Sequence, residues 1–123
     1  MTMRVLATAL VLLALPVTAP DAGAARQGNS QLWGAIAYST KTGSFGYAVD
    51  RKTRRDAEMD AFRQCGANCD LIRPFRDGCA AVAAKPTRTS SDTGASRRIA
   101  EMKALKKCGS DCAVKVSACT SEQ

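Results

Sequence analysis

A thirteen-residue segment occurs twice in the chain, and this duplication limits the fold more than any other feature of the sequence. Residues 57–69 return as residues 100–112, and seven of the thirteen positions are identical at one constant offset of 43 without a gap. The identical positions in the first copy are Ala57, Glu58, Met59, Ala61, Cys65, Gly66 and Cys69. A unit of this size cannot bury a sufficient core alone, so the pattern predicts one domain made of two similar units that pack together.

The first unit is predicted to have the order β-β-α-β. Alternating apolar residues and turn signals indicate three strands, at 33–38, 45–49 and 71–75. Thr53 is the expected N-cap of the helix between the second and third strands. Gly66 is its expected C-cap, and Gly109 has the same role in the second unit. Pro74 cannot donate a hydrogen bond to a sheet, which places the third strand at an edge or at a bend.

The second unit repeats this order with weaker signals. Strands are expected at 79–84 and 113–119, with a helix over 97–107 that begins after Ser96. Thr, Ser and Gly dominate residues 85–95, which contain no aromatic residue and therefore predict a loop or a very weak strand. The expected fold is α+β: two β-β-α-β pseudo-repeats whose strands pair between units in a small antiparallel sheet, packed by two helices and held by disulfides.

The N-terminus has the form of a secretory signal peptide. A positive start at Arg4 precedes an apolar run over residues 5–17, and small residues follow up to Ala24 and Ala25. Thirteen residues are too few for a membrane span, which needs about 20. The mature protein is therefore expected to be secreted or periplasmic, without a transmembrane span. The expected organisation is a signal peptide at 1–25, a flexible segment at 26–32 and one duplicated domain at 33–120, with units at about 33–78 and 79–120.

All six cysteines follow this N-terminal segment. An even number of cysteines behind an export signal predicts three disulfides in an oxidising compartment. The alternative is a zinc site, but zinc sites usually have a tighter C-x2-C spacing, and the chain contains no histidine. We therefore expect neither a metal nor a cofactor.

The repeat favours one pairing of the cysteines, although six cysteines permit fifteen. Two local clips and one link between the third cysteines of the two units follow the symmetry: Cys65–Cys69, Cys108–Cys112 and Cys79–Cys119. In the chain-entropy model, each five-residue loop contributes about 2 kcal/mol and the 41-residue loop about 4 kcal/mol. Other pairings across the units stay open, because nine residues separate Cys69 from Cys79 but only six separate Cys112 from Cys119.

The chain carries a net charge of +7, which removal of the signal peptide leaves unchanged. Such a charge favours acidic partners. Basic residues gather where the two helices are expected to begin: Arg51, Lys52, Arg54, Arg55, Arg97 and Arg98. A cation in the first turn opposes the helix dipole by about 0.3–1 kcal/mol, and an anion bound there would offset that cost. The alternative is that these side chains lie over the sheet and pair with Asp50, Asp56 or Asp60.

We identify no catalytic residues in the sequence. Without histidine the usual general base is missing, and the C-x3-C spacing differs from the redox-active C-x-x-C. Asp56 and Asp60 share a helix face and could act as a carboxylate pair. However, Arg54, Arg55 and Arg63 lie beside them, which favours solvated ion pairs. We therefore expect a protein that is not an enzyme.

Several of these motifs together resemble one family. They are the opening run Trp33-Gly34-Ala35-Ile36-Ala37-Tyr38-Ser39, the helix that ends in Cys65-Gly66, the spacing of Cys69 and Cys79, and the repeat that closes at Cys119. On these residues the chain resembles domain-of-unknown-function family 4189, a family of small exported bacterial domains. The second hairpin departs from the first, because it lacks the Gly/aromatic return strand. The resemblance implies export and a duplicated α+β fold, and it brings no established catalytic residues.

These observations favour an exported, disulfide-stabilised binding module. Aromatic and arginine side chains dominate binding hot spots, so the candidate surface is the first hairpin together with the basic residues near it. The aromatic members of this surface are Trp33, Tyr38, Phe45 and Tyr47, although Phe45 is expected to belong to the core. The expected partner is an acidic protein or an anionic envelope polymer, and no specific nucleic acid. The alternatives are a periplasmic inhibitor or immunity-type protein and an envelope hydrolase that uses carboxylates.

Overall fold

The computed structural model describes residue 14 and residues 31–121. The predicted signal peptide, apart from residue 14, and residues 26–30 of the predicted flexible segment lie outside the described residues. Residues 31–121 contain two helices and six strands, in this order: β1 (Trp33–Tyr38), β2 (Phe45–Arg51), α2 (Arg54–Cys65), β3 (Leu71–Arg76), β4 (Cys79–Lys85), β5 (Arg88–Gly94), α3 (Arg97–Cys108) and β6 (Ala113–Cys119). The α+β class and the duplicated β-β-α-β order are thereby confirmed.

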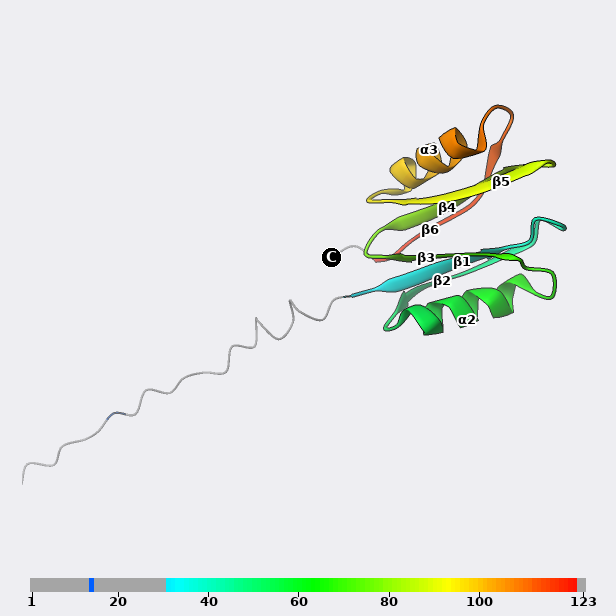
Figure 1. Ribbon diagram of the computed structural model, residues 1–123. Helices are drawn as coiled ribbons and strands as arrows, with labels where there is room; N and C mark the ends of the chain where they lie inside the picture. The colour runs from blue at the N-terminus through cyan, green and yellow to red at the C-terminus, as the bar shows by residue number, and fades with distance from the viewer. Residues whose placement is uncertain (1–13, 15–30, 122–123) are drawn as a thin grey trace, which may run out of the picture.

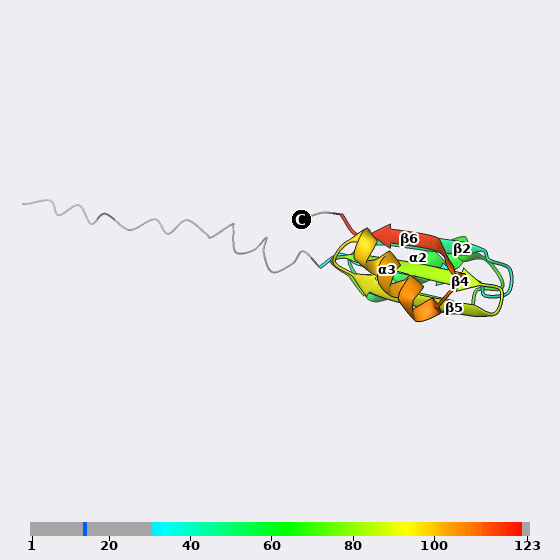
Figure 2. The same cartoon turned by 90° about the horizontal axis from the view of Figure 1, so that it is seen from above.

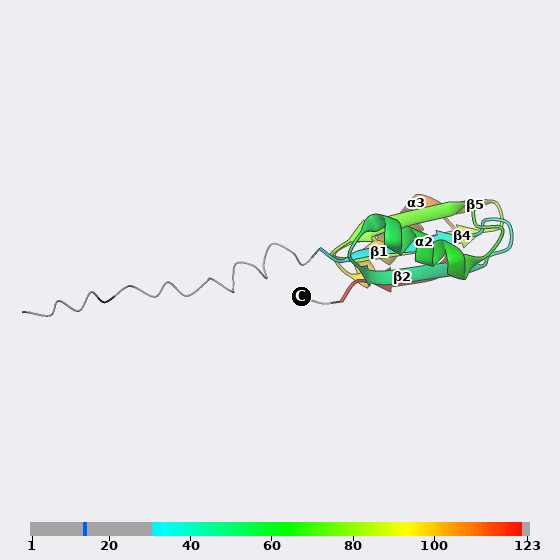
Figure 3. The ribbon, with the colours of Figure 1, turned by 90° about the horizontal axis from the view of Figure 1, so that it is seen from below.

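The elements form four layers, in the order helix, sheet, sheet, helix (Figure 1). The first sheet has the antiparallel order β2-β1-β3, and the second has the order β5-β4-β6. Figure 2 looks down on α3 and the second sheet, and Figure 3 looks from the opposite side onto α2 and the first sheet. Each helix therefore covers the outer face of the sheet formed by its own unit, and the inner faces of the two sheets pack together.

The expectation of one sheet with strands pairing between units is wrong, because every strand pairs within its own unit. The central strands explain the difference. In β1, Ile36 faces the inner core between the sheets, whereas Ala35 and Ala37 face α2. In β4, Val82 faces the same inner core and Ala83 faces α3. A strand with apolar residues on both faces needs a layer on each side, and stacked sheets supply it.

Alanine and glycine allow the helices to lie very close to the sheets. Ala57 and Ala61 of α2 are fully buried against the alanines of the first sheet. A Cβ atom added at Gly46 of β2 would lie 2.3 Å from the carbonyl oxygen of Ala61, so only glycine fits there. In α3, Ala100 and Ala104 have the same role.

The expected helix caps are confirmed. The Thr53 hydroxyl accepts a hydrogen bond of 3.1 Å from the backbone N–H of Asp56, and the Ser96 hydroxyl accepts one of 3.2 Å from Ile99. Gly66 ends α2 with φ 98°, and Gly109 ends α3 with φ 96°. Glycine populates this region of positive φ without the steric cost that other residues incur.

Residues 85–95 form a regular strand over most of their length, so the expectation of a loop or a very weak strand is wrong. β5 pairs with β4 without interruption, from Gly94 opposite Cys79 to Arg88 opposite Lys85. The Nζ atoms of Lys103 and Lys107, on α3, donate to backbone carbonyls of β5 at 2.7 and 3.1 Å. Pairing with β4 and these hydrogen bonds from α3 hold β5 in place without an aromatic side chain. The sequence pattern did not indicate these hydrogen bonds.

All six cysteines are paired, and the pairs are those that the repeat favours: Cys65–Cys69, Cys108–Cys112 and Cys79–Cys119. The third disulfide, however, does not link the two units. Cys79 begins β4 and lies opposite Cys119 of β6, so this disulfide closes the second sheet on itself. The two units are held together by the packing of their inner faces and by polar contacts such as the 3.4 Å ion pair of Arg73 with Asp92.

Candidate functional site

The aromatic residues of the first hairpin do not form one surface. Tyr38 is 5% exposed and belongs to the inner core, so it is not available to a partner. Trp33 lies on the opposite face of the sheet, half-buried beside the alanines that pack against α2. Phe45 and Tyr47 lie at the edge of the sheet and are each 46% exposed, so the expectation that Phe45 belongs to the core is wrong. Alternation along β1 separates Trp33 from Tyr38. Phe45 and Tyr47 share the face of Tyr38, but they are exposed because β2 is an edge strand.

Trp33 has a structural role that its place in the repeat explains. In the first sheet Trp33 lies opposite Arg76, at the position where the second sheet has Cys79 opposite Cys119. The guanidinium carbon of Arg76 lies 5.5 Å from the centre of the Trp33 ring, which is a cation–π distance. A stacked pair in one unit thus takes the place of a disulfide in the other.

The basic residues at the start of α2 are largely occupied by carboxylates of the same unit. Arg51 Nε lies 2.8 Å from Asp60 Oδ2, and Arg54 Nε lies 2.5 Å from Glu58 Oε1. Arg63 also pairs with Asp60, at 3.1 Å. Hydrogen bonding to Arg51 and the charges of Arg51 and Arg63 hold the pKa of Asp60 below its usual value, although partial burial opposes this. These contacts are the ion pairs expected as the alternative to an anion site.

The remaining basic residues at the helix starts belong to opposite sides of the molecule. Arg97 donates to the carbonyl and to the hydroxyl of Ser117, at 2.9 and 2.5 Å. Lys52, Arg55 and Arg98 are exposed. The two helices begin at the same end of the domain but in its two outermost layers, with both sheets between them (Figure 1). The predicted basic cluster is therefore two separate groups, one on each side.

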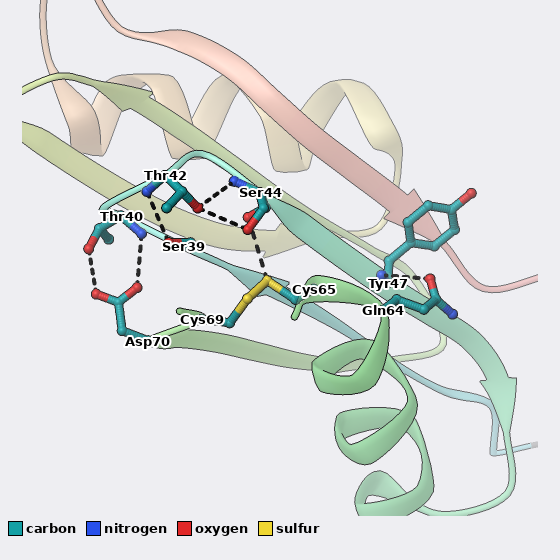
Figure 4. The surroundings of a disulfide bond; sticks show 9 residues. All are labelled: Ser39, Thr40, Thr42, Ser44, Tyr47, Gln64, Cys65, Cys69 and Asp70. Carbon is teal, nitrogen blue, oxygen red and sulfur yellow. Dashed lines mark hydrogen bonds between the residues drawn. A yellow bond between two sulfur atoms is a disulfide. The ribbon is translucent and has the colours of Figure 1, made fainter. Parts of the chain in front are cut away.

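The turn between β1 and β2 and the first disulfide lie together at the far end of the first sheet (Figure 4). Asp70 accepts hydrogen bonds from the hydroxyl of Thr40 and, at 2.9 Å, from its backbone N–H, which lowers the pKa of Asp70. Cys65 Sγ lies 3.5 Å from the carbonyl oxygen of Ser44. A sulfur in a disulfide carries no proton, so this is a contact and not a hydrogen bond. Cys65 and Cys69 thus fix the end of α2 against the turn.

A comparison of the two helices at corresponding positions shows where the units differ most. Helix α2 carries three arginines and three acidic residues, whereas α3 carries five basic residues and one acidic residue. Three changes account for the whole difference in charge: Asp56 corresponds to Ile99, Asp60 to Lys103 and Gln64 to Lys107. The net charge rises from 0 on α2 to +4 on α3, while the buried alanines and cysteine stay identical.

The outward side of α3, which we call the α3 face, consists of Arg98, Ile99, Met102 and Lys106. Ile99 is 46% exposed and Met102 is 57% exposed. Within residues 31–121, neither Arg98 nor Lys106 has an ion pair or a side-chain hydrogen bond. The α3 face thus combines two exposed apolar side chains with two cations that have no partner in the described part of the chain.

Two lysines along the β5 side of α3 have a different environment, because they surround one carboxylate. Lys103 Nζ and Lys107 Nζ lie 3.6 and 3.7 Å from the carboxylate oxygens of Asp92, and Arg73 of the other unit lies 3.4 Å away. Burial raises the pKa of Asp92, but the Thr93 backbone N–H and these three cations outweigh it and hold the pKa below its usual value. This cluster ties α3, β5 and β3 together.

Helix α2 has an apolar groove instead of a basic face. Glu58, Met59, Phe62 and Arg63 line it together with Ile72 of β3, and its volume is about 330 Å³. Met59 and Phe62 are both exposed.

No group of three or more His, Cys, Asp or Glu side chains that could hold a metal occurs among the described residues. Neither α2 nor α3 is long and apolar enough to cross a membrane, and the described residues contain no other candidate span.

Sequence reasoning did not identify the α3 face, because it concentrated on positions that the two copies share. The differences between the copies carried the information: the acidic positions 56 and 60 of the first copy become Ile99 and Lys103 in the second.

Three disulfides in a domain of this size indicate an oxidising location outside the cytosol.

Comparisons with known proteins agree with the duplicated fold. The chain is similar to the NMR structure of Rv1813c from Mycobacterium tuberculosis, with 32% sequence identity and a TM-score of 0.61 over 72% of this chain and 74% of that one. No curated protein matches the chain. The family model described as "Domain of unknown function (DUF4189)" matches residues 33–119, which include both units. The chain therefore belongs to the DUF4189 family.

Proposed function

We propose that this protein is a non-enzymatic binding module that acts in the periplasm or outside the cell and holds an anionic partner against the α3 face. The observation that carries the proposal is the difference between the two helices of the repeat. Their buried residues match, yet the net charge is 0 on α2 and +4 on α3. Packing against the sheet uses the alanines of both helices and, in α3, Lys103 and Lys107, but it does not use Arg98 or Lys106.

The distribution of partners within the chain supports the same site. On α2 each arginine except Arg55 pairs with a carboxylate of its own helix. On α3, Arg98 and Lys106 point to solvent and have no such partner within the described residues. Cations without internal partners are available to phosphate, sulfate or carboxylate groups of another molecule.

The carboxylates of α2 give little support to the alternative of a hydrolase. A general acid needs a raised pKa, whereas the arginines around Asp60 lower its pKa. Asp56 is exposed near the start of the helix, where its backbone N–H is used by the Thr53 cap. An inhibitor or immunity-type protein is a finer version of the binding proposal, in which the anionic partner is an acidic protein.

Two double variants of equal charge test the proposal. Arg98→Glu with Lys106→Glu reverses the charge of the two cations on the α3 face. Arg55→Glu with Arg63→Glu makes the same change of charge at the corresponding positions of α2. Both variants alter the net charge by the same amount. A cation near an anionic surface contributes about 1 kcal/mol, so loss of two should weaken binding by at least about 30-fold.

Binding to immobilised dextran sulfate, measured over a range of salt concentrations, is the assay. The α3 variant should bind at least about 30-fold more weakly than the wild type, with a shallower salt dependence. The α2 variant should stay close to the wild type. Equal losses in both variants would mean that net charge alone drives binding, and the proposal would then fail.

A further inference from the structure

We propose that the anionic partner of the α3 face is the surface of a membrane rich in anionic phospholipids. Helix α3 would lie parallel to the membrane plane, with Ile99 and Met102 inserted among the headgroups and the cations against the phosphates. This inference rests on the proposed function and adds the class of partner. It differs from a transmembrane arrangement, because α3 has only twelve residues and its inward side is occupied by the second sheet.

The first step of the argument is the exposed apolar pair. Ile99 and Met102 lie in the middle of the α3 face, and about half of each is exposed to solvent. The residue of α2 that corresponds to Ile99 is Asp56, so the repeat does not require an apolar side chain at this position. Burying such side chains is favourable, and a purely ionic polymer offers no apolar medium in which they could be buried.

The second step is the arrangement of the cations. Arg98 and Lys106 occupy the two ends of the α3 face, with Met102 between them at spacings of four residues. Lys103 and Lys107 follow the β5 side of the helix. Apolar residues in the centre with lysine and arginine around them are typical of helices that lie in the membrane interface, because long basic side chains reach the phosphates while their stems stay apolar.

The third step is that the helix is already formed and held in place. Ala100, Ala104 and Cys108 are buried against the second sheet, and the Cys108–Cys112 disulfide fixes the end of the helix. Ser96 caps its beginning. Helix α3 forms the outermost layer on its side of the domain, as Figure 2 shows. A flat surface can therefore approach it, and binding requires no folding of the helix, which lowers the entropic cost of association.

The combination favours a lipid surface over the other anionic partners. A membrane interface supplies phosphates and an apolar layer together over a broad plane. A polymer supplies only the charges, and an acidic protein would need a groove shaped to accept Ile99 and Met102.

The test uses vesicles of phosphatidylcholine with about one-third phosphatidylglycerol, and vesicles of phosphatidylcholine alone as the neutral control. The variant Ile99→Ser with Met102→Ser removes the apolar pair without changing the charge. Its matched control is Met59→Ser with Phe62→Ser, which removes two exposed apolar residues from α2. Thermal unfolding of each variant confirms that it is folded, and dextran sulfate binding is measured in parallel.

The inference predicts that the wild type binds the anionic vesicles and not the neutral ones. The Ile99/Met102 variant should bind the anionic vesicles about 10- to 30-fold more weakly while its affinity for dextran sulfate stays unchanged. The α2 control should behave as the wild type. Binding to dextran sulfate but not to anionic vesicles would overturn the lipid inference and leave the proposed function standing. Equal vesicle binding by the wild type and the Ile99/Met102 variant would overturn the insertion of these side chains. If the wild type binds neither the anionic vesicles nor dextran sulfate, the proposed function is overturned as well.

Discussion

The Cys79–Cys119 disulfide should contribute more to stability than either local clip, although each of the three is a single disulfide between two cysteines. It closes a loop of 41 residues, whereas each clip closes five. The chain-entropy model gives about 4 kcal/mol for the long loop and about 2 kcal/mol for a clip. A domain of this size has a total stability of roughly 5–14 kcal/mol, so the long disulfide supplies a large share. Replacing Cys79 and Cys119 by alanine should therefore lower the Tm by about 15–30 °C.

The matched control is the replacement of Cys108 and Cys112 by alanine, because that disulfide lies in the same unit. We expect a fall of about 8–16 °C in its Tm. Urea unfolding followed by circular dichroism gives the free energy of unfolding for both variants and the wild type. If the two double variants lose the same free energy, loop length is not the source of the stabilisation and the reasoning is refuted.

Two further predictions concern the packing of α2 and the carboxylate between the units. Gly46→Ala should lower the free energy of unfolding by about 3 kcal/mol or more, because the new Cβ meets the backbone of α2. Gly66→Ala should lower it by only about 1 kcal/mol, because Gly66 has a positive φ but open space around it. Urea unfolding measures both values, and equal losses would contradict the close approach of helix and sheet. Asp92→Asn should lower the free energy of unfolding at pH 7 by about 1–2 kcal/mol. Because the folded state lowers the pKa of Asp92, its contribution is fully present above about pH 4, near the unfolded pKa, and is lost as the pH falls below that value. The difference between wild type and variant should therefore narrow only below about pH 4, and a difference that stays constant on further acidification would contradict the role of the charge.

The sequence predicted the local structure well because local rules determine it. Thr53 and Ser96 satisfy backbone N–H groups at the helix starts, and Gly66 and Gly109 take up the positive φ values at the ends. The alternating apolar residues also predicted a strand at 33–38, which is β1. None of these signals depends on residues that are distant in the chain.

The partners of the strands could not be obtained in the same way. Periodicity shows which side of a strand is apolar, but not whether the next layer is a helix, a second sheet or the same sheet. The residues of β4 predicted a strand, but not that the first sheet covers one of its faces and α3 the other. Residues 88–94 form a strand although they are polar, because they pair with β4 and two lysines of α3 bind their backbone carbonyls; only the folded structure brings these elements together.

The candidate site shows the same limit. Trp33, Tyr38 and Tyr47 are close in the sequence, yet Trp33 lies on the α2 side of the sheet, and Tyr38 and Tyr47 share the other face but differ in burial. Residues such as Arg98 and Lys106 were visible as charges, but their lack of internal partners depends on what surrounds α3. A position-by-position comparison of the two copies would have indicated the difference in charge without a structure.

The most direct test of the central claim is a titration of the 15N-labelled, oxidised protein with dextran sulfate, followed residue by residue in 1H–15N correlation spectra. If the α3 face is the binding site, chemical-shift changes will concentrate on the backbone amides of residues 97–108 and will decrease as salt is added. The amides of residues 54–65, on the corresponding helix of the first unit, should remain unchanged. Changes that concentrate on residues 54–65, or that spread evenly over both helices, would contradict the claim.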